Sequence, residues 1–303
     1  MHDRRTFFRA SGLVLSTAAL GLGATACSRT STGGGAAGDG DLLERLRKAG
    51  KITVAFAGEA PYSFEDDGEL TGATIALHRE IFPALGIDEV EGVLTEWGSL
   101  IPGLNAKRFD AVSAGMSILP DRCSEAAFTD PEIQYTTAIL TPKGNPEGLE
   151  NLQSFEGKDL KLATMSGAIE SDYCEQLGID NMQVQSPQDG VDAVQGGRAD
   201  AFALTGISLK YMVEKQGIDL DVTESFVAEV DGVKQFGAGS TVLRPDEDSA
   251  SLLKAYNEEL GKIMGDTERF LGIVGDFGFT EAEIPPEEMT TQMLCEGDLS
   301  ELQ

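Results

Sequence analysis

Residues 114–135 have the sequence A-G-M-S-I-L-P-D-R-C-S-E-A-A-F-T-D-P-E-I-Q-Y, and they decide how the rest of the chain is interpreted. An apolar run at residues 109–114 leads into this stretch and predicts a buried strand that ends at the G-M-S step. Ligands of α/β proteins bind beyond the carboxyl ends of such strands. Arg122 follows at that place, and a guanidinium is a planar fork that binds carboxylates bidentately. Arg122 is therefore a candidate ligand-binding residue, with a surface ion pair to Asp121 or Glu125 as the alternative.

The composition is that of a globular protein with a strong excess of acid. The chain has 303 residues, of which 41% are hydrophobic and 24% are charged, and this length suffices for two domains with a substantial core. With Lys+Arg 23 against Asp+Glu 51, the formal net charge is −28. This charge argues against nucleic acid and anionic membrane surfaces as partners. We expect a monomer.

The first 26 residues have the features of a signal peptide. R-R-T-F-F-R at residues 4–9 matches a twin-arginine signal, and the apolar region at residues 12–26 is too short to anchor the chain across a bilayer. The small residues A-T-A then precede Cys27 in a pattern that resembles a lipoprotein box, in which Cys27 is lipidated and becomes the first mature residue. Ordinary cleavage near Ala26 is the alternative.

Residues 27–40 are rich in Ser, Thr and Gly and have no large apolar side chain, which predicts a flexible tether. We therefore expect an exported protein that is lipid-anchored on the outer face of the cytoplasmic membrane. Its contact with the membrane is expected through the lipid on Cys27 alone.

The pattern after the tether is that of an α/β protein with two lobes. A-K-R-F-D-A-V-S-A-G at residues 106–115 is similar to G-R-A-D-A-F-A-L-T-G at residues 197–206, and each lies between a predicted helix and a predicted strand. Two related α/β units indicate two lobes of similar build. Residues 134–140 and 236–243 are apolar stretches that flank the second unit, and we expect them to be crossing strands that form a hinge.

The expected boundaries follow from these patterns. Lobe 1 comprises residues 41–137 plus 241–285, lobe 2 comprises residues 138–240, and residues 286–303 form a C-terminal tail. Within lobe 1, periodicity predicts a helix at residues 42–49, a strand at 51–56, a helix at 74–85, a strand at 90–95 and a helix at 99–106.

Two motifs in this chain resemble those of a known family. M-S-I-L-P-D-R at residues 116–122 and F-T-D-P at residues 128–131 are similar to the M-[ST]-x-[ST]-P-E-R and F-[ST]-x-P motifs of the family 3 extracytoplasmic solute-binding proteins of polar amino acid ABC importers. The resemblance covers residues 51–279. It implies an α/β, two-lobed periplasmic-binding-protein-like fold (type II) with the ligand in the interlobe cleft and a two-strand hinge. It also implies closure on the ligand, delivery to the transmembrane subunits of an ABC permease, and a ligand carboxylate held by Arg122.

Three further motifs resemble the branch of that family that binds ectoine and hydroxyectoine. They are E-x-P-[FY] at residues 59–62, E-[YW]-G-x-[ML]-I-P-G-L at residues 96–104 and P-[ED]-R-C at residues 120–123. This resemblance implies a small zwitterionic compatible solute whose cation is a cyclic amidinium. In that assignment Glu59 accepts the N–H groups of the cation, while Tyr62 and Trp97 offer it their π faces.

The chain departs from both patterns at single positions. In the amino acid binders an aspartate after the second-lobe strand pairs with the α-ammonium, and this chain has Thr205 there. A buried ammonium without a partner is costly, so a polar amino acid is the alternative ligand and is disfavoured. In the ectoine branch an aromatic wall stands where this chain has Ser117, which leaves the cage incomplete unless Phe64 or another ring fills it.

Ser166, Gly167 and Ala168 follow a predicted strand of the second unit and open a predicted helix. Free N–H groups at a helix start are able to meet an anion, so these three residues are ligand-binding candidates. Ser166 is equally well explained as the N-cap of the helix. The family's threonine at this helix start is replaced by Ala168 and Ile169, which leaves the second-lobe contact without that hydroxyl.

Three cysteines follow Cys27, and export permits disulfides. Cys123 is next to Arg122 and Cys295 lies in the tail, so a bridge between them could tie the tail beside the site. The ectoine branch resembles this chain in both of these cysteines. Cys174, on a predicted helix, is expected to be a small buried side chain.

Catalytic and metal-binding patterns are missing from the sequence. It has two histidines, His2 in the signal peptide and His78 within a predicted helix, and it has no H-E-x-x-H, G-x-S-x-G or phosphate-loop motif. We therefore expect a binding protein without a cofactor, a metal or enzymatic activity. A dehydratase-like enzyme on the same fold is the remaining rival, and Glu59 is the acid or base that it would use.

Overall fold

The structure is a computed structural model that describes residues 40–302, apart from the side chain of Glu301. The expected signal peptide at residues 1–26, the lipidated Cys27 and the tether up to residue 39 lie outside the described residues. Within the described part, no helix has the length and apolarity needed to cross a bilayer.

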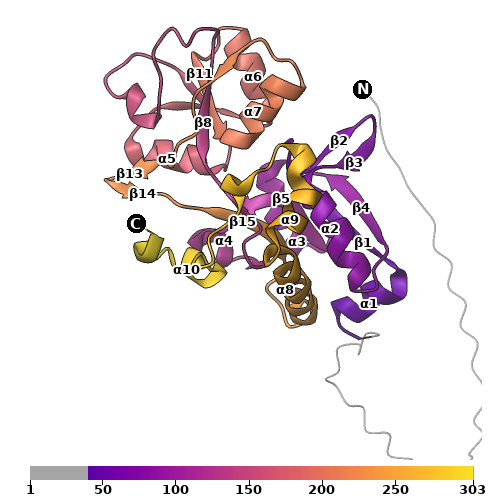
Figure 1. Cartoon of the computed structure of the whole chain (residues 1–303). Helices are drawn as coiled ribbons and strands as arrows, with labels where there is room; N and C mark the ends of the chain where they lie inside the picture. Colours follow the sequence, from indigo (N-terminus) through magenta and orange to yellow (C-terminus); the bar gives the residue numbers. More distant parts are fainter. Residues whose placement is uncertain (1–39, 303) are drawn as a thin grey trace, which may run out of the picture. The chain divides into compact units, whose positions relative to one another are not determined.

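The first sheet unites the two chain segments of lobe 1. Its strand order is β4-β1-β5-β15-β6, and β7 also pairs with β15. The strands β1, β4, β5 and β15 are labelled in Figure 1. β1 runs parallel to β4 and β5, whereas β15 runs antiparallel to β5, β6 and β7. The bounds are Lys51–Phe56 for β1, Glu89–Leu94 for β4, Ala111–Ser117 for β5, Ala127–Phe128 for β6, Ile133–Gln134 for β7 and Ala238–Leu243 for β15.

Helices cover both faces of this sheet. Successive side chains of a strand point to opposite faces, so each strand contributes to a core on either side. Ile52 and Val54 of β1 belong to one core, and Ala55 belongs to another. The first core is shared with α1 (Leu42–Ala49), α2 (Ala73–Ala84), α8 (Ala250–Met264) and α9 (Thr267–Val274). The second core is shared with α3 (Leu100–Asn105) and α10 (Thr291–Glu296). Every residue of β5 is buried, as expected of a strand that is covered on both sides.

The second sheet has the strand order β10-β9-β11-β8-β12. β9 is parallel to β10 and β11, and β8 is antiparallel to β11 and β12. The bounds are Thr137–Thr141 for β8, Leu162–Met165 for β9, Asn181–Val184 for β10, Ala201–Thr205 for β11 and Asp221–Val222 for β12. The helices α5 (Ile169–Leu177), α6 (Pro187–Gln195) and α7 (Gly206–Lys215) pack on this sheet.

Two short segments connect the sheets. The chain passes from β7 to β8 through Tyr135 and returns through Gly237 into β15, and the N–H of Tyr135 donates to the carbonyl of Gly237 at 2.9 Å. These crossings fall at the two stretches expected to form the hinge. β15 pairs with β7 from Ala238 onward, so its first residues belong to the lobe 1 sheet and the return to lobe 1 comes a few residues before the expected boundary.

The remaining elements are short. β2 pairs with β3, and β13 pairs with β14. The bounds are Phe64–Asp66 for β2, Glu69–Thr71 for β3, Glu229–Val230 for β13 and Val233–Lys234 for β14. The helix α4 comprises Pro120–Cys123. Short 3-10 helices lie at Trp97–Ser99, Leu152–Phe155, Gly275–Phe277, Glu281–Glu283 and Ser300–Leu302.

The C-terminal tail is held against α4. The expected disulfide is present between Cys123 of α4 and Cys295 of α10, with Cα atoms 5.6 Å apart. Cys174 is free and buried in α5, and burial raises the pKa of its thiol to about 12. The thiol is therefore protonated and unreactive in the folded protein.

We expect peptide mapping without reduction to recover Cys123 linked to Cys295. Cys174 should resist alkylation in the folded protein and react after denaturation, because its thiol is buried and its pKa is raised. Alkylation of Cys123 and Cys295 without prior reduction would contradict the disulfide, and rapid alkylation of Cys174 under native conditions would contradict its burial.

Candidate functional site

A small pocket, here called the central pocket, lies where residues of both lobes converge. From lobe 1 it is lined by Glu59, Tyr62, Trp97, Ser117 and Tyr135, among others. From lobe 2 it is lined by Ala168, Ile169, Glu170, Leu204 and Thr205, among others. Its volume is ≈ 20 Å³. That is space for roughly one water molecule, so a small solute enters only if the lobes move apart.

Glu59 is the acid of the pocket on the lobe 1 side. It follows β1 in the loop that leads to β2, and only 4% of its surface is exposed. Its Oε1 accepts hydrogen bonds from the hydroxyls of Ser208 at 2.6 Å and Thr205 at 3.1 Å, both from lobe 2. Burial raises the pKa of Glu59 to about 7, although the two hydroxyls act in the opposite direction. These hydrogen bonds make the acid a link between the lobes.

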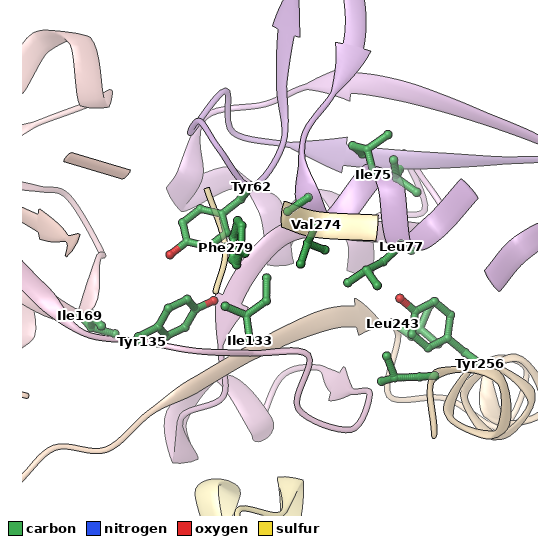
Figure 2. Close-up of a cluster of buried hydrophobic side chains, with 14 of the residues drawn as sticks. Tyr62, Ile75, Leu77, Ile133, Tyr135, Ile169, Leu243, Tyr256, Val274 and Phe279 are labelled. Atoms are coloured by element: carbon green, nitrogen blue, oxygen red, sulfur yellow. The ribbon is translucent and has the colours of Figure 1, made fainter. Parts of the chain in front are cut away.

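Aromatic rings form another wall of the central pocket. The Tyr62 ring packs edge-on against the rings of Tyr135 at 5.8 Å and Phe279 at 5.9 Å (Figure 2). The hydroxyl of Tyr135 donates to the carbonyl of Gly115. Tyr135 thus places a further ring on the wall of the pocket that Ser117 also lines. Phe64 does not line the pocket, since its ring packs against Tyr211 at 5.7 Å.

Arg122 lies in α4, immediately after β5. Its Nη1 donates to the carbonyl of Ser117 at 3.0 Å and its Nη2 donates to the carbonyl of Gly167 at 2.7 Å. Among the described residues it makes no ion pair with Asp121 or Glu125, so the alternative of a surface ion pair is wrong. Burial lowers the pKa of the guanidinium from its ordinary value, which leaves it charged at neutral pH.

Trp97 connects Arg122 with lobe 2. The Cζ atom of Arg122 lies 5.6 Å from the centroid of the indole ring, which is within cation–π range. The indole N–H donates to the carbonyl of Gly167 at 2.9 Å, so Trp97 and Arg122 share one lobe 2 acceptor. Trp97 therefore lies in the cleft, as expected.

Arg122 borders a second cavity next to the central pocket. This side cavity has a volume of ≈ 630 Å³ and is lined by residues of α4, α5, the returning crossing segment and the C-terminal tail. Ser117 and Ile169 line both cavities, whereas Arg122 and Gly167 line the side cavity. The guanidinium is thus adjacent to the central pocket, at its border with the larger space.

The start of α5 differs from the expected arrangement. The helix begins at Ile169 and Ala168 occupies the N-cap position without a side-chain hydrogen bond, so the interpretation of Ser166 as N-cap is wrong. The reason is Gly167, whose φ of +75° adds a turn between the strand and the helix. Ser166 lines neither cavity, and its N–H donates to Val184. Of the three candidates at this turn, Ala168 lines the central pocket and Gly167 presents its carbonyl to Arg122.

Glu170 is a pocket residue that the sequence interpretation missed. It lies in the first turn of α5 and is fully buried. Its Oε1 accepts from the hydroxyl of Thr137 at 3.3 Å, and its Oε2 makes no hydrogen bond to another described residue. Burial raises its pKa to about 8. The available sequence signal was an acid two positions after Ala168, but acids are common in first helical turns and the position was not distinguished from those.

No arrangement for metal or acid–base catalysis by histidine is present in the described part. No group of three or more His, Cys, Asp or Glu residues there is placed to hold a metal ion. His78 is buried in α2 with its ring 4.9 Å from that of Phe82, and its Nε2 lies 2.7 Å from the hydroxyl of Thr241. Burial lowers its pKa to about 3, so the imidazole is neutral. It does not line the central pocket.

Comparison with known proteins identifies the family. The chain matches the model of the bacterial extracellular solute-binding proteins, family 3, over residues 52–269. It is 32% identical over 262 residues to a probable amino-acid ABC transporter periplasmic-binding protein of Sinorhizobium fredii, covering 84% of this chain and 85% of the relative. It is 27% identical over 215 residues to the lysine/arginine/ornithine-binding periplasmic protein of Escherichia coli, covering 68% of this chain and 79% of the relative.

Solved structures give the same result. The crystal structure of EhuB in complex with hydroxyectoine is similar with a TM-score of 0.73 and 29% identity, covering 84% of this chain and 97% of that chain. An ancestral amino acid-binding protein, described as a precursor of cyclohexadienyl dehydratase, is similar with a TM-score of 0.68 and 24% identity over 78% of this chain and 98% of that chain. The second likeness shows the fold alone. Together they confirm the two-lobed type II periplasmic-binding-protein fold.

The two sequence relatives, from Sinorhizobium fredii and Escherichia coli, are named as binding proteins, in agreement with the expectation that this protein is not an enzyme. The chain belongs to the bacterial extracellular solute-binding proteins, family 3, and it is a binding protein rather than an enzyme.

Proposed function

We propose that this protein is the substrate-binding component of an ABC importer and that it binds a small zwitterionic compatible solute, ectoine or hydroxyectoine. In this proposal the lipid on Cys27 holds the protein, as a monomer, on the outer face of the cytoplasmic membrane near its permease. The closing lobes present the solute to the transmembrane subunits.

The distribution of charge around the central pocket carries this proposal. Glu59 and the rings of Tyr62 and Trp97 line the pocket, and Arg122 lies at its border beside Ser117. An acid with π faces suits a delocalised cation, and a guanidinium suits a carboxylate. A zwitterion with a cyclic amidinium carries both groups on one small molecule. The structural relative that is bound to hydroxyectoine supports the same class of ligand.

A polar amino acid is the second candidate, favoured by the names of the sequence relatives. A free amino acid needs an acid for its α-ammonium. At the position where the amino acid binders have that acid, this chain has Thr205, whose hydroxyl donates to Glu59 and so supports the acid of the other lobe. We therefore favour the cyclic amidinium over the α-ammonium.

Binding by closure follows from the contacts between the lobes. Glu59 is bonded to Thr205 and Ser208, and Gly167 accepts from both Trp97 and Arg122. A ligand that contacts groups of both lobes binds the closed form better than the open form, so it shifts the population toward the closed form. The permease would recognise that form.

A fluorescence titration tests the ligand, because Trp97 is the only tryptophan of the chain and lines the pocket. We expect ectoine and hydroxyectoine to give a saturable change in Trp97 emission with the tether-free mature protein, and glycine betaine to give none. The same titration with L-arginine, L-lysine and L-histidine serves as the control. A saturable response to an amino acid, with none to ectoine, would overturn the ligand that we propose.

Arg122→Ala should weaken binding by about 3 kcal/mol or more, because it leaves the ligand carboxylate buried without its charged partner. Isothermal titration calorimetry with ectoine measures this loss. Arg79→Ala is the matched control, since Arg79 is an exposed arginine in α2 that donates to the carbonyl of Leu70. Equal affinity of Arg122→Ala and wild type would remove Arg122 from the site.

Glu59→Gln should weaken binding of a cationic group by about 1.5–3 kcal/mol, since it replaces a charged acceptor by a neutral one. The amide oxygen still accepts from Ser208 and Thr205, and the cost of burying a carboxylate disappears, so the midpoint of thermal unfolding without ligand should not fall. Calorimetry and thermal unfolding are measured on the same preparation. A parallel loss of affinity and stability would mean that Glu59 is a structural acid.

A further inference from the structure

The central pocket holds a second buried acid, on the opposite lobe from Glu59. Glu170 enters from α5 of lobe 2, and Glu59 enters from the loop after β1 of lobe 1. Both line the same cavity of ≈ 20 Å³. A ligand in this pocket would therefore lie between two carboxyl groups.

The bonding of Glu170 within the protein is incomplete. Thr137 gives Oε1 one hydrogen bond at 3.3 Å, and Oε2 makes none to another described residue. A fully buried acceptor without a donor has lost its hydrogen bonds to water and gained none in return, which destabilises the folded protein, and more so when the group is charged. Most buried polar atoms of native proteins have a partner, and this atom without one belongs to a residue that lines the central pocket, where a ligand is able to supply the donor.

The surroundings of Glu170 offer no cation that bonds to it. Arg122 is the positive charge that acts on Glu170, and its two donating nitrogens are directed to the carbonyls of Ser117 and Gly167. The titratable groups that face Glu170 from the packed elements are Glu59, Arg122, Tyr62, Tyr135, Tyr173 and Cys174. Apart from Arg122, each of these is an acid or a neutral group, so a cation that bonds directly to Glu170 would be supplied by a ligand.

We propose that Glu170 is a second ligand-binding carboxylate, which accepts an N–H from the lobe 2 side of the ligand's cation while Glu59 accepts another from the lobe 1 side. This inference rests on the proposed function and narrows it. The pocket selects cations that carry N–H donors in two directions, such as an amidinium or a guanidinium. It discriminates against quaternary ammonium groups, which have no N–H to offer.

The substitution at Thr205 fits this assignment. The acid that the amino acid binders carry after the second-lobe strand is missing here, and Thr205 donates to Glu59 instead. Glu170 restores one lobe 2 acid to the pocket from a different element. The two acids then lie on opposite lobes, so one delocalised cation bonded to both of them stabilises closure directly.

The test compares Glu170→Gln with wild type by calorimetry, using ectoine, L-arginine and glycine betaine as probes. For the probe with N–H donors that binds wild type, we expect Glu170→Gln to weaken binding about 10- to 100-fold. The midpoint of thermal unfolding without ligand should stay the same or rise, because an incompletely bonded buried carboxyl is removed. Glycine betaine should bind neither protein.

Glu132→Gln is the matched control. Glu132 is also fully buried, and its Oε2 also makes no hydrogen bond to another described residue. It lies outside the central pocket, in a lobe 1 cluster where Thr129, Thr241 and Tyr256 donate to its Oε1. Glu132→Gln should therefore change affinity by less than about threefold.

The pH dependence of affinity is a second readout. Burial raises the pKa of Glu59 to about 7 and that of Glu170 to about 8, so both acids are partly protonated near neutral pH. A bound cation favours the ionised forms, so binding releases protons and affinity rises with pH. In wild type we expect the rise to continue through pH 8. In Glu170→Gln the part of the rise near pH 8 should be lost, while the part near pH 7 that belongs to Glu59 stays.

The outcomes separate the two proposals. If wild type binds ectoine and Glu170→Gln binds it equally well, the role of Glu170 is overturned and the proposed function stands. If Glu132→Gln loses as much affinity as Glu170→Gln, the loss is structural and the role of Glu170 is again overturned. If wild type binds glycine betaine and none of the N–H probes, both the ligand class and the role of Glu170 fail.

Discussion

The free-energy cost of removing charged groups from water determines how the residues of this cleft are arranged. A carboxylate that leaves water must find donors, and Glu59 finds them in Thr205 and Ser208 on the other lobe. The acid therefore has its hydrogen bonds only when the lobes are together. The interaction that offsets its burial is also the interaction that couples lobe 1 to lobe 2, so binding chemistry and conformational change depend on the same atoms.

A second coupling point is the carbonyl of Gly167, which accepts from Trp97 and from Arg122. A guanidinium binds a carboxylate through two parallel N–H···O bonds and a full opposite charge, and a single carbonyl offers neither. In the proposed function, a ligand carboxylate would therefore compete effectively with this carbonyl for the guanidinium. The disulfide from Cys123 to Cys295 ties the short helix that carries Arg122 to α10. The backbone of Arg122 is therefore held in place, and an exchange of partners requires only its side chain to move.

The fold was largely predictable from local patterns, whereas the site was predictable only in part. The helix at residues 42–49 and the strand at 51–56 coincide with α1 and β1, because apolar periodicity and Gly50 at the helix end decide both without distant contacts. The start of α5 was not predictable in this way, since the turn at Gly167 moves the cap from Ser166 to Ala168. Glu59, Tyr62, Trp97 and Arg122 could be proposed from the sequence because they follow strands and stand in recognisable motifs.

Tyr135 and Glu170 were missed for a common physical reason. Neither stands at a motif position, and each acquires its role from packing between elements that are distant in the sequence: Tyr135 against Tyr62, and Glu170 beside Thr137. When the sequence is compared with the family position by position, Ser117 stands where a ring is expected and Thr205 where an acid is expected. The pocket nevertheless has a further ring, that of Tyr135, and a further acid, Glu170. A ligand is selected by all the charged groups and aromatic rings that line the cavity together. Different sequences can place the same set of groups there from different helices, strands and loops. The ligand is therefore better inferred from the complete set of pocket groups than from any single substituted residue.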